Sequence, residues 1–200
     1  MHLPQAFTDY TANLFGPQRW ARFVHALAEP APVSVRFNPF KPLSSCPFTH
    51  ATPVPWCKHA YWLAERPNFT LDPLFHAGVY YVQEAGSLFL DTVVRACITS
   101  PVSALDACAA PGGKTCFMAE WLADRSEKDN GVSGMVNAYD ISAQKLERID
   151  ENLKRCRLSN VRCEVKDASV YDETMSETAD AVIADLPCSG LGVIGRKVDI

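Results

Sequence analysis

Hydrophobic and polar positions follow two different periods along the chain, and the change of period separates two regions. Residues 4–28 carry apolar side chains at the spacing of amphipathic helices, and Gly16-Pro17 interrupts them, so the pattern predicts a pair of helices. Their expected buried faces consist of Phe7, Tyr10, Leu14, Trp20, Phe23, Val24 and Leu27. A strand is predicted over residues 33–37, followed by an irregular connection over the Pro-, Ser- and Thr-rich residues 39–57.

Helical segments alternate with short apolar runs in the rest of the chain. A short strand or turn is predicted over 78–81, and then an amphipathic helix over 84–98. The expected buried face of that helix consists of Leu88, Phe89, Thr92, Val93 and Ala96. Strands are predicted over 102–107, 134–139, 161–166 and 180–185, and helices over 113–124 and 142–156. This alternation is typical of an α/β fold with a parallel sheet.

Acidic residues stand at or next to the ends of the predicted parallel strands. They are Asp106, Asp140, Asp167 and Asp185. A single acid at such a point is commonly a helix N-cap. Ligands of open parallel sheets, however, bind beyond the carboxyl ends of the strands, so four acids at equivalent points predict a ligand site there.

A tight turn at Pro111-Gly112-Gly113 joins the strand 102–107 to the next helix, which presents backbone N–H groups to a ligand. One candidate ligand is phosphate, because Gly113-Lys114-Thr115 ends like a P-loop and residues 181–185 resemble a Walker B strand. Against it, Cys108 stands where a P-loop has its first glycine, and Pro111 lacks an N–H group. The other candidate is a nucleoside cofactor whose ribose hydroxyls are bound by an acid after the second strand. Asp140 has that position, which favours S-adenosylmethionine.

Composition limits the compartment and the kinds of partner. The chain has 200 residues, 48% of them hydrophobic, without an apolar run that could span a membrane and without a signal peptide. Its eight cysteines show neither Cys-x-x-Cys pairs nor zinc spacing, so we expect free thiols in a reducing cytoplasm and no metal.

Charge is distributed unevenly along the chain. The net charge of −4 argues against sequence-independent binding of nucleic acid. Residues 1–75 nevertheless contain six Lys and Arg against four Asp and Glu, whereas residues 76–200 contain thirteen against nineteen. The basic side chains that an RNA backbone attracts are therefore denser in the first third.

Two stretches of the sequence are distinctive in combination. They are Asp106-Ala107-Cys108-Ala109-Ala110-Pro111-Gly112-Gly113-Lys114-Thr115 and Asp185-Leu186-Pro187-Cys188-Ser189-Gly190. The first resembles the cofactor motif, and the second the Asp-x-Pro-Cys-Ser-Gly motif, of the NOL1/NOP2/Sun family of RNA cytosine-5 methyltransferases. Residues 32–39 and 81–87 are weaker matches to the same family. The chain is most similar to the bacterial members that act on ribosomal RNA.

The resemblance implies a fold, a division of the chain and a cofactor site. The fold would be a Rossmann-like methyltransferase sheet, present as its first four strands, after a small α+β N-terminal region. Residues 1–75 would form that region and help to dock RNA, and residues 76–200 would begin the S-adenosylmethionine-dependent domain. Residues Cys108, Ala109, Ala110, Pro111, Gly112, Gly113 and Lys114 would surround the methionine portion of the cofactor. Asp140 would bind the ribose, Asp167 the adenine amino group, and Asp185 would lie between the methionine and the target base.

Two sets of residues keep more than one interpretation. Arg36, Asn38 and Lys41 are either surface polar residues or, by resemblance, part of the RNA-docking region. Cys188 is either a small buried hydrophobe or, by resemblance, the residue that assists product release.

The expected activity is methylation of carbon 5 of a cytosine in RNA, ribosomal RNA rather than transfer RNA. The nucleophilic cysteine of the family comes from a later Thr-Cys motif, which we expect beyond residue 200. The 200 residues alone would then bind the cofactor weakly or not at all and would transfer no methyl group, and strand 180–185 would be an exposed apolar edge. The alternatives are a non-catalytic RNA-binding or ribosome-assembly module with the same fold, and a P-loop NTPase.

Overall fold

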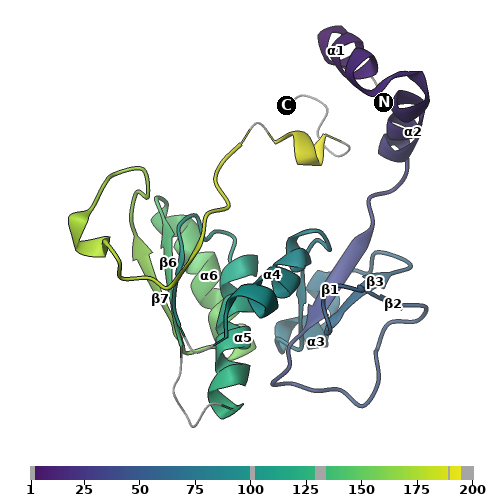
Figure 1. The fold of residues 1–200 in the computed structure, drawn as a ribbon. Coiled ribbons are helices and arrows are strands. Elements are labelled where there is room, and N and C mark those ends of the chain that lie inside the picture. The colour runs from purple at the N-terminus through teal and green to yellow at the C-terminus, as the bar shows by residue number, and fades with distance from the viewer. Residues whose placement is uncertain (1–2, 100–101, 129–133, 189, 195–200) are drawn as a thin grey trace. The chain divides into compact units, whose positions relative to one another are not determined.

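The computed structural model describes residues 3–99, 102–128, 134–188 and 190–194, which fall into two compact units. One unit contains residues 33–186, and the other combines residues 1–32 with 187–200. The predicted division at residue 75 differs from this one. The ribbon of Figure 1 shows both units, and each is described here by itself.

The smaller unit contains the two predicted helices, α1 (Gln5–Phe15) and α2 (Pro17–Ala28), and a short 3-10 turn, η4 (Leu191–Val193). Gly16 ends α1 with a φ of 72°, and Pro17 starts α2 at the position where its missing N–H costs nothing. Phe7, Phe15 and Trp20 pack around the ring of Phe23. Tyr10, Leu14 and Val24 are exposed, so the prediction of a buried face was wrong for these three.

An antiparallel sheet opens the larger unit, with the strand order β2-β3-β1-β4. Its strands are β1 (Val33–Phe37), β2 (Thr52–Pro53), β3 (Ala60–Leu63) and β4 (Tyr80–Val82). The turn η1 (Phe69–Leu71) and the short helix α3 (Pro73–His76) connect β3 to β4. Val35 pairs with both Tyr61 and Val82, so β4 belongs to this sheet although it follows residue 75.

A parallel sheet follows, with the order β7-β6-β5-β8. Its strands are β5 (Ser103–Asp106), β6 (Met135–Asp140), β7 (Val161–Val165) and β8 (Ala181–Ile183), connected by α5 (Gly113–Lys128), α6 (Ala143–Cys156) and the turn η3 (Glu173–Met175). The predicted α/β fold with a parallel sheet is confirmed. In Figure 1, α5 and α6 lie beside this sheet, and their apolar side chains form one core with alternate strand residues such as Ala104 and Val136. Among the described residues β8 is an edge strand with an exposed Val182, as expected.

The helix predicted over 84–98 is shorter and faces a different way. It consists of a 3-10 turn, η2 (Ser87–Phe89), and α4 (Leu90–Cys97). Leu88, Asp91 and Val94 are buried, whereas the other residues of the predicted face, Phe89, Thr92, Val93 and Ala96, are exposed. Apart from Leu88, the predicted face was therefore wrong.

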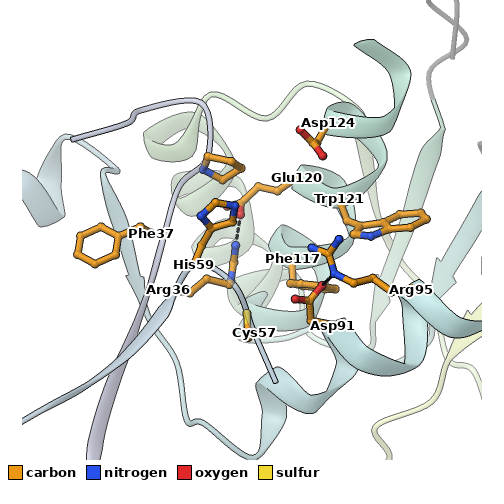
Figure 2. A pocket seen from close by; sticks show the side chains of 11 residues that line it. Arg36, Phe37, Cys57, His59, Asp91, Arg95, Phe117, Glu120, Trp121 and Asp124 are labelled. Atoms are coloured by element: carbon orange, nitrogen blue, oxygen red, sulfur yellow. Dashed lines mark hydrogen bonds and ion pairs between the residues drawn. The ribbon is translucent and has the colours of Figure 1, made fainter. Parts of the chain in front are cut away.

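Polar residues of the first region join the two sheets. Arg36 on β1 forms an ion pair with Glu120 on α5, and both side chains are almost completely buried, with 3% and 4% exposed (Figure 2). Asn38 is buried too and donates to the carbonyl oxygens of Gly78 and Cys156, at 3.1 and 3.0 Å. Lys41 donates to the Ala77 and Arg155 carbonyl oxygens. Both interpretations of Arg36 and Asn38 are therefore wrong, because these side chains are neither on the surface nor available to RNA.

Candidate functional site

Backbone interactions hold the loop between β5 and α5 in place. Ala109 donates its N–H to the Tyr139 carbonyl at 2.8 Å, which holds the loop against the end of β6. Gly112 has a φ of 99°, and a β carbon there would lie 3.3 Å from Ile149 Cγ1. Glycine is thus required at this position both by the backbone and by the space available.

A cavity of about 200 Å³ lies next to this loop, at the carboxyl end of β5. Most of the predicted cofactor residues line it, namely Cys108, Ala109, Ala110, Pro111, Gly113, Lys114 and Asp185, together with Asp106. The rest of the wall comes from Tyr81, Val82, Gln83, Glu84 and Ser87, which follow or belong to β4 of the antiparallel sheet. These five residues were not predicted as site residues, although residues 81–87 had matched the family weakly.

Asp140 and Asp167 do not line this cavity, but they lie on neighbouring strand ends. Asp140 ends β6, and its carbonyl accepts the N–H of Lys166 just after β7, at 3.1 Å. The Asp140 carboxylate accepts the N–H of Ser142 at 3.0 Å. Asp167 is exposed, and its carboxylate accepts from both the N–H and the hydroxyl of Ser169, which lowers its pKa. One oxygen of each carboxylate is thus used in a local turn.

Lys114 and Asp185 form an ion pair across the cavity wall. Asp185 is exposed, so solvent screens the pair and its contribution to stability is small. The pair places a positive and a negative group together at the mouth of the cavity.

Asp106 differs from the other three acids because it is buried. Its Oδ2 accepts the hydroxyl of Thr115 at 2.7 Å, whereas Oδ1 has no partner among the described residues. Burial raises the pKa of this carboxyl group, and the bond from Thr115 opposes that shift. Asp106 therefore attaches the first turn of α5 to the end of β5.

The two cysteines of the motifs have different surroundings. The pKa of the Cys108 thiol is raised, first by burial and then by the charges of Asp140, Asp106, Asp185 and Asp167. Burial and the four acids thus act in the same direction, and both disfavour the thiolate form of Cys108. Cys188 belongs to the smaller unit, where it is exposed and its sulfur accepts the N–H of Gly190 at 3.4 Å. It is not a buried hydrophobe.

The described ranges contain neither a metal-binding cluster nor a helix suited to a membrane. No group of three or more His, Cys, Asp or Glu side chains is placed to hold a metal ion there. In those ranges no helix combines the length and the apolarity that crossing a bilayer requires.

Solved structures share this fold. A methyltransferase homologue from Pyrococcus horikoshii superposes with a TM-score of 0.70 at 25% identity, over 98% of this chain and 68% of that one. The NSun6 protein of the same organism, crystallised with SFG, has a TM-score of 0.71 at 16% identity, over 93% of this chain and 71% of that one. The architecture is therefore that of the methyltransferase class of α/β proteins.

Sequence comparison defines the family more narrowly. Residues 3–85 match the N-terminal domain of 16S rRNA methyltransferase RsmF, and residues 100–200 match 16S rRNA methyltransferase RsmB/F. The chain belongs to the RsmB/F family of 16S rRNA methyltransferases, which confirms the resemblance found in its motifs.

Curated relatives carry the name ribosomal RNA small subunit methyltransferase F. Those of Klebsiella pneumoniae and Vibrio cholerae are both 32% identical to the chain, over 100% and 98% of its length. The chain spans about two fifths of the length of these relatives, 43% and 42%.

Proposed function

We propose that the chain forms the cofactor-binding part of an S-adenosylmethionine-dependent enzyme that methylates carbon 5 of a cytosine in ribosomal RNA. The observation that carries this proposal is the cavity beside the diglycine loop, within a chain of the RsmB/F family. The names of the relatives favour ribosomal over transfer RNA.

The residues present suit a nucleoside cofactor. Residues 108–114 would hold its methionine portion, since six of them line the cavity and the Gly112 turn keeps the loop backbone close. Asp140 would bind the ribose and Asp167 the adenine amino group; Asp140 ends β6, and Asp167 follows the neighbouring strand β7 by two residues. The cofactor supplies a methyl group activated by a sulfonium. Asp185 would lie between this methyl group and the base.

The chemistry needs a thiolate and an unstacked base. Carbon 5 of cytosine is a poor nucleophile until a thiolate adds to carbon 6, and the base must leave its stack to be reached. Cys108 is unsuited to this addition because burial, and then the charges of the surrounding acids, raise the pKa of its thiol. Cys188 takes the role of assisting product release in this proposal.

RNA docking by residues 1–75 would rest on side chains that are exposed. Arg36 and Asn38 are buried and Lys41 is bonded to main-chain carbonyls. The exposed basic residues of this region are Arg19, Arg22, Lys58 and Arg66. They would contact phosphate groups and set the position of the RNA without reading its sequence.

Bisulfite sequencing of ribosomal RNA from cells with and without the gene tests the activity. We expect one cytosine to be protected from conversion only when the gene is present. Re-expression of Asp140→Asn or Cys188→Ser should fail to restore full protection, whereas Glu147→Gln, an exposed change on α6, should restore it. Unchanged bisulfite patterns together with defective ribosome assembly would instead favour the non-catalytic module.

Calorimetry separates the cofactor proposal from a P-loop NTPase. The natural gene product should bind S-adenosylmethionine and should not bind ATP, because Cys108 and Pro111 replace groups of the phosphate cradle. Binding of ATP that is lost in Lys114→Ala, without binding of S-adenosylmethionine, would overturn the proposal.

A further inference from the structure

A hydrogen-bonded chain leads from the junction of the two sheets to the cavity and ends at Gln83. The main chain of Gln83 is held by β1, since its N–H donates to the Ser34 carbonyl at 3.2 Å and its carbonyl accepts the Ser34 hydroxyl at 2.6 Å. The backbone of Gln83 therefore has a fixed position relative to the antiparallel sheet.

The side chain of Gln83 is oriented by Arg36. The Arg36 Nε donates to Gln83 Oε1 at 3.1 Å, and the same guanidinium forms the buried ion pair with Glu120 (Figure 2). A guanidinium carries only donors, so the atom of the amide that faces it must be the oxygen. The amide nitrogen, Nε2, must then point the other way.

Nε2 lies beside the diglycine loop. A β carbon built on Gly113 would be 3.4 Å from it, which is van der Waals contact, so Nε2 lies directly against the loop. Gln83 lines the cavity and is only 8% exposed. Over the described part of the chain nothing accepts a hydrogen bond from Nε2. Nε2 is not one of the fully buried polar atoms that lack a partner, so it is open to the cavity. A donor that is held in one orientation and has no protein acceptor can bind an acceptor of a ligand there.

We infer that Gln83 Nε2 donates a hydrogen bond to the α-carboxylate of the amino-acid portion of the cofactor, and that Arg36 and Glu120 are the positioning residues for this bond. The inference rests on the proposed function. The carboxylate is the acceptor because Nε2 lies against Gly113, in the loop that would surround the methionine portion, and because a charged acceptor gains most from a preorganised donor. The target base would lie on the Asp185 side of the cavity instead.

Two ligands and one isosteric substitution test the bond. S-adenosylhomocysteine carries the carboxylate, and 5′-methylthioadenosine lacks the whole amino-acid portion. Gln83→Glu keeps an oxygen for Arg36 and replaces the donor facing the cavity by an acceptor. In the natural gene product we expect this variant to bind S-adenosylhomocysteine about tenfold to a hundredfold more weakly, and 5′-methylthioadenosine within about twofold of wild type. Gln144→Glu, the same change on the exposed face of α6, should alter neither affinity.

Arg36→Lys tests the positioning role, because it removes the planar fork and keeps a charge for Glu120. We expect this variant, too, to lose more affinity for S-adenosylhomocysteine than for 5′-methylthioadenosine. A variant that is merely less stable would not change the ratio of the two affinities. Folding is checked by circular dichroism, and Gln83→Met, with a side chain of similar length but no amide, replaces Gln83→Glu if the latter does not fold. Equal losses for both ligands, or no loss for either, would overturn the inference while leaving the proposed function intact. A wild-type protein that binds neither ligand would overturn both.

Discussion

At the scale of single residues, burial determines how strongly an ion pair affects the stability of the fold. Arg36–Glu120 and Arg162–Glu164 have the same chemistry, but the first pair is buried and the side chains of the second are 75% and 47% exposed. An exposed pair is screened by water and contributes little. A buried pair leaves an uncompensated charge in a low-dielectric interior when one partner is removed.

Removing one partner of the buried pair should therefore destabilise the protein strongly. We expect Glu120→Leu to lower the free energy of unfolding by about 3–5 kcal/mol in urea titrations. The double variant Arg36→Met/Glu120→Leu should lose less free energy of unfolding than Glu120→Leu, because neither buried charge remains. Glu164→Leu is the control and should change the free energy of unfolding by less than about 1 kcal/mol. An equal decrease in the free energy of unfolding in Glu120→Leu and Glu164→Leu would show that the buried pair matters no more for stability than the exposed one.

The acids around the cavity should also be visible in the reactivity of Cys108. Their negative charges raise the pKa of its thiol, so the thiolate forms, and iodoacetamide alkylation becomes fast, at higher pH than for a thiol in a model peptide. Asp140→Asn removes the largest of these charge effects, lowers the thiol pKa and should speed alkylation at pH 7–8. Mass spectrometry of the labelled Cys108 peptide measures this rate. A slower reaction in Asp140→Asn would contradict the electrostatic explanation.

At the scale of elements, local patterns predicted the strands of the parallel sheet but missed β2 and β3 of the antiparallel sheet, and they were wrong for buried positions of α1, α2 and α4. The strands of the parallel sheet lie within two residues of their predicted ends, because apolar runs end at Gly, Pro and Asp, which act locally. The face of α4 was wrong for two reasons. The 3-10 turn η2 shifts the phase of the helix, and Asp91, which pairs with Arg95, takes a buried position that a hydrophobic pattern assigns to an apolar residue.

The turn before β4 packs against the end of α6 with no space for a side chain. Gly78 has a φ of 67°, and a β carbon there would lie 2.0 Å from the Arg155 carbonyl oxygen. Gly78→Ala should therefore lower the free energy of unfolding by well over the roughly 1 kcal/mol that is typical of alanine at a positive φ. Arg157→Gly is the control in the same region, because Arg157 has a φ of 59° and glycine relieves that conformation. In urea titrations, the free energy of unfolding should fall in Gly78→Ala and rise in Arg157→Gly.

At the scale of the whole molecule, the site is built from segments far apart in sequence. The loop 108–114 could be predicted because its glycines and its position after a strand are local signals. The wall formed by Tyr81 to Ser87 could not be derived from periodicity, since it depends on β4 pairing with β1 and on the antiparallel sheet meeting α5. The polar residues Gln83 and Glu84 directly after a strand were the available signal. The roles of residues 108–114, Asp140, Asp167, Asp185 and Cys188 remain predictions.

In the part of the chain that the structure describes, the three clusters of buried apolar residues lie between residues 33 and 186. A chain of residues 33–186 should therefore unfold cooperatively, with a melting temperature within a few degrees of that of the whole chain. Residues 33–99 alone should not fold, because they separate Arg36 from Glu120 and Asn38 from Cys156. Circular dichroism melting of both fragments measures this. A cooperative transition in residues 33–99 would show that the antiparallel sheet is an independent domain.

The junction at the end of α6 has a mechanical consequence. Arg155 donates to the Phe75 and Tyr80 carbonyls at 2.6 and 3.1 Å, beside the bonds that Asn38 makes to Gly78 and Cys156. These hydrogen bonds tie the antiparallel sheet to the end of α6, although one family model matches residues 3–85 and the other residues 100–200. We therefore expect the opposing walls of the cavity to keep their spacing when a molecule enters, so that the cavity acts as a preformed site and does not close like two lobes.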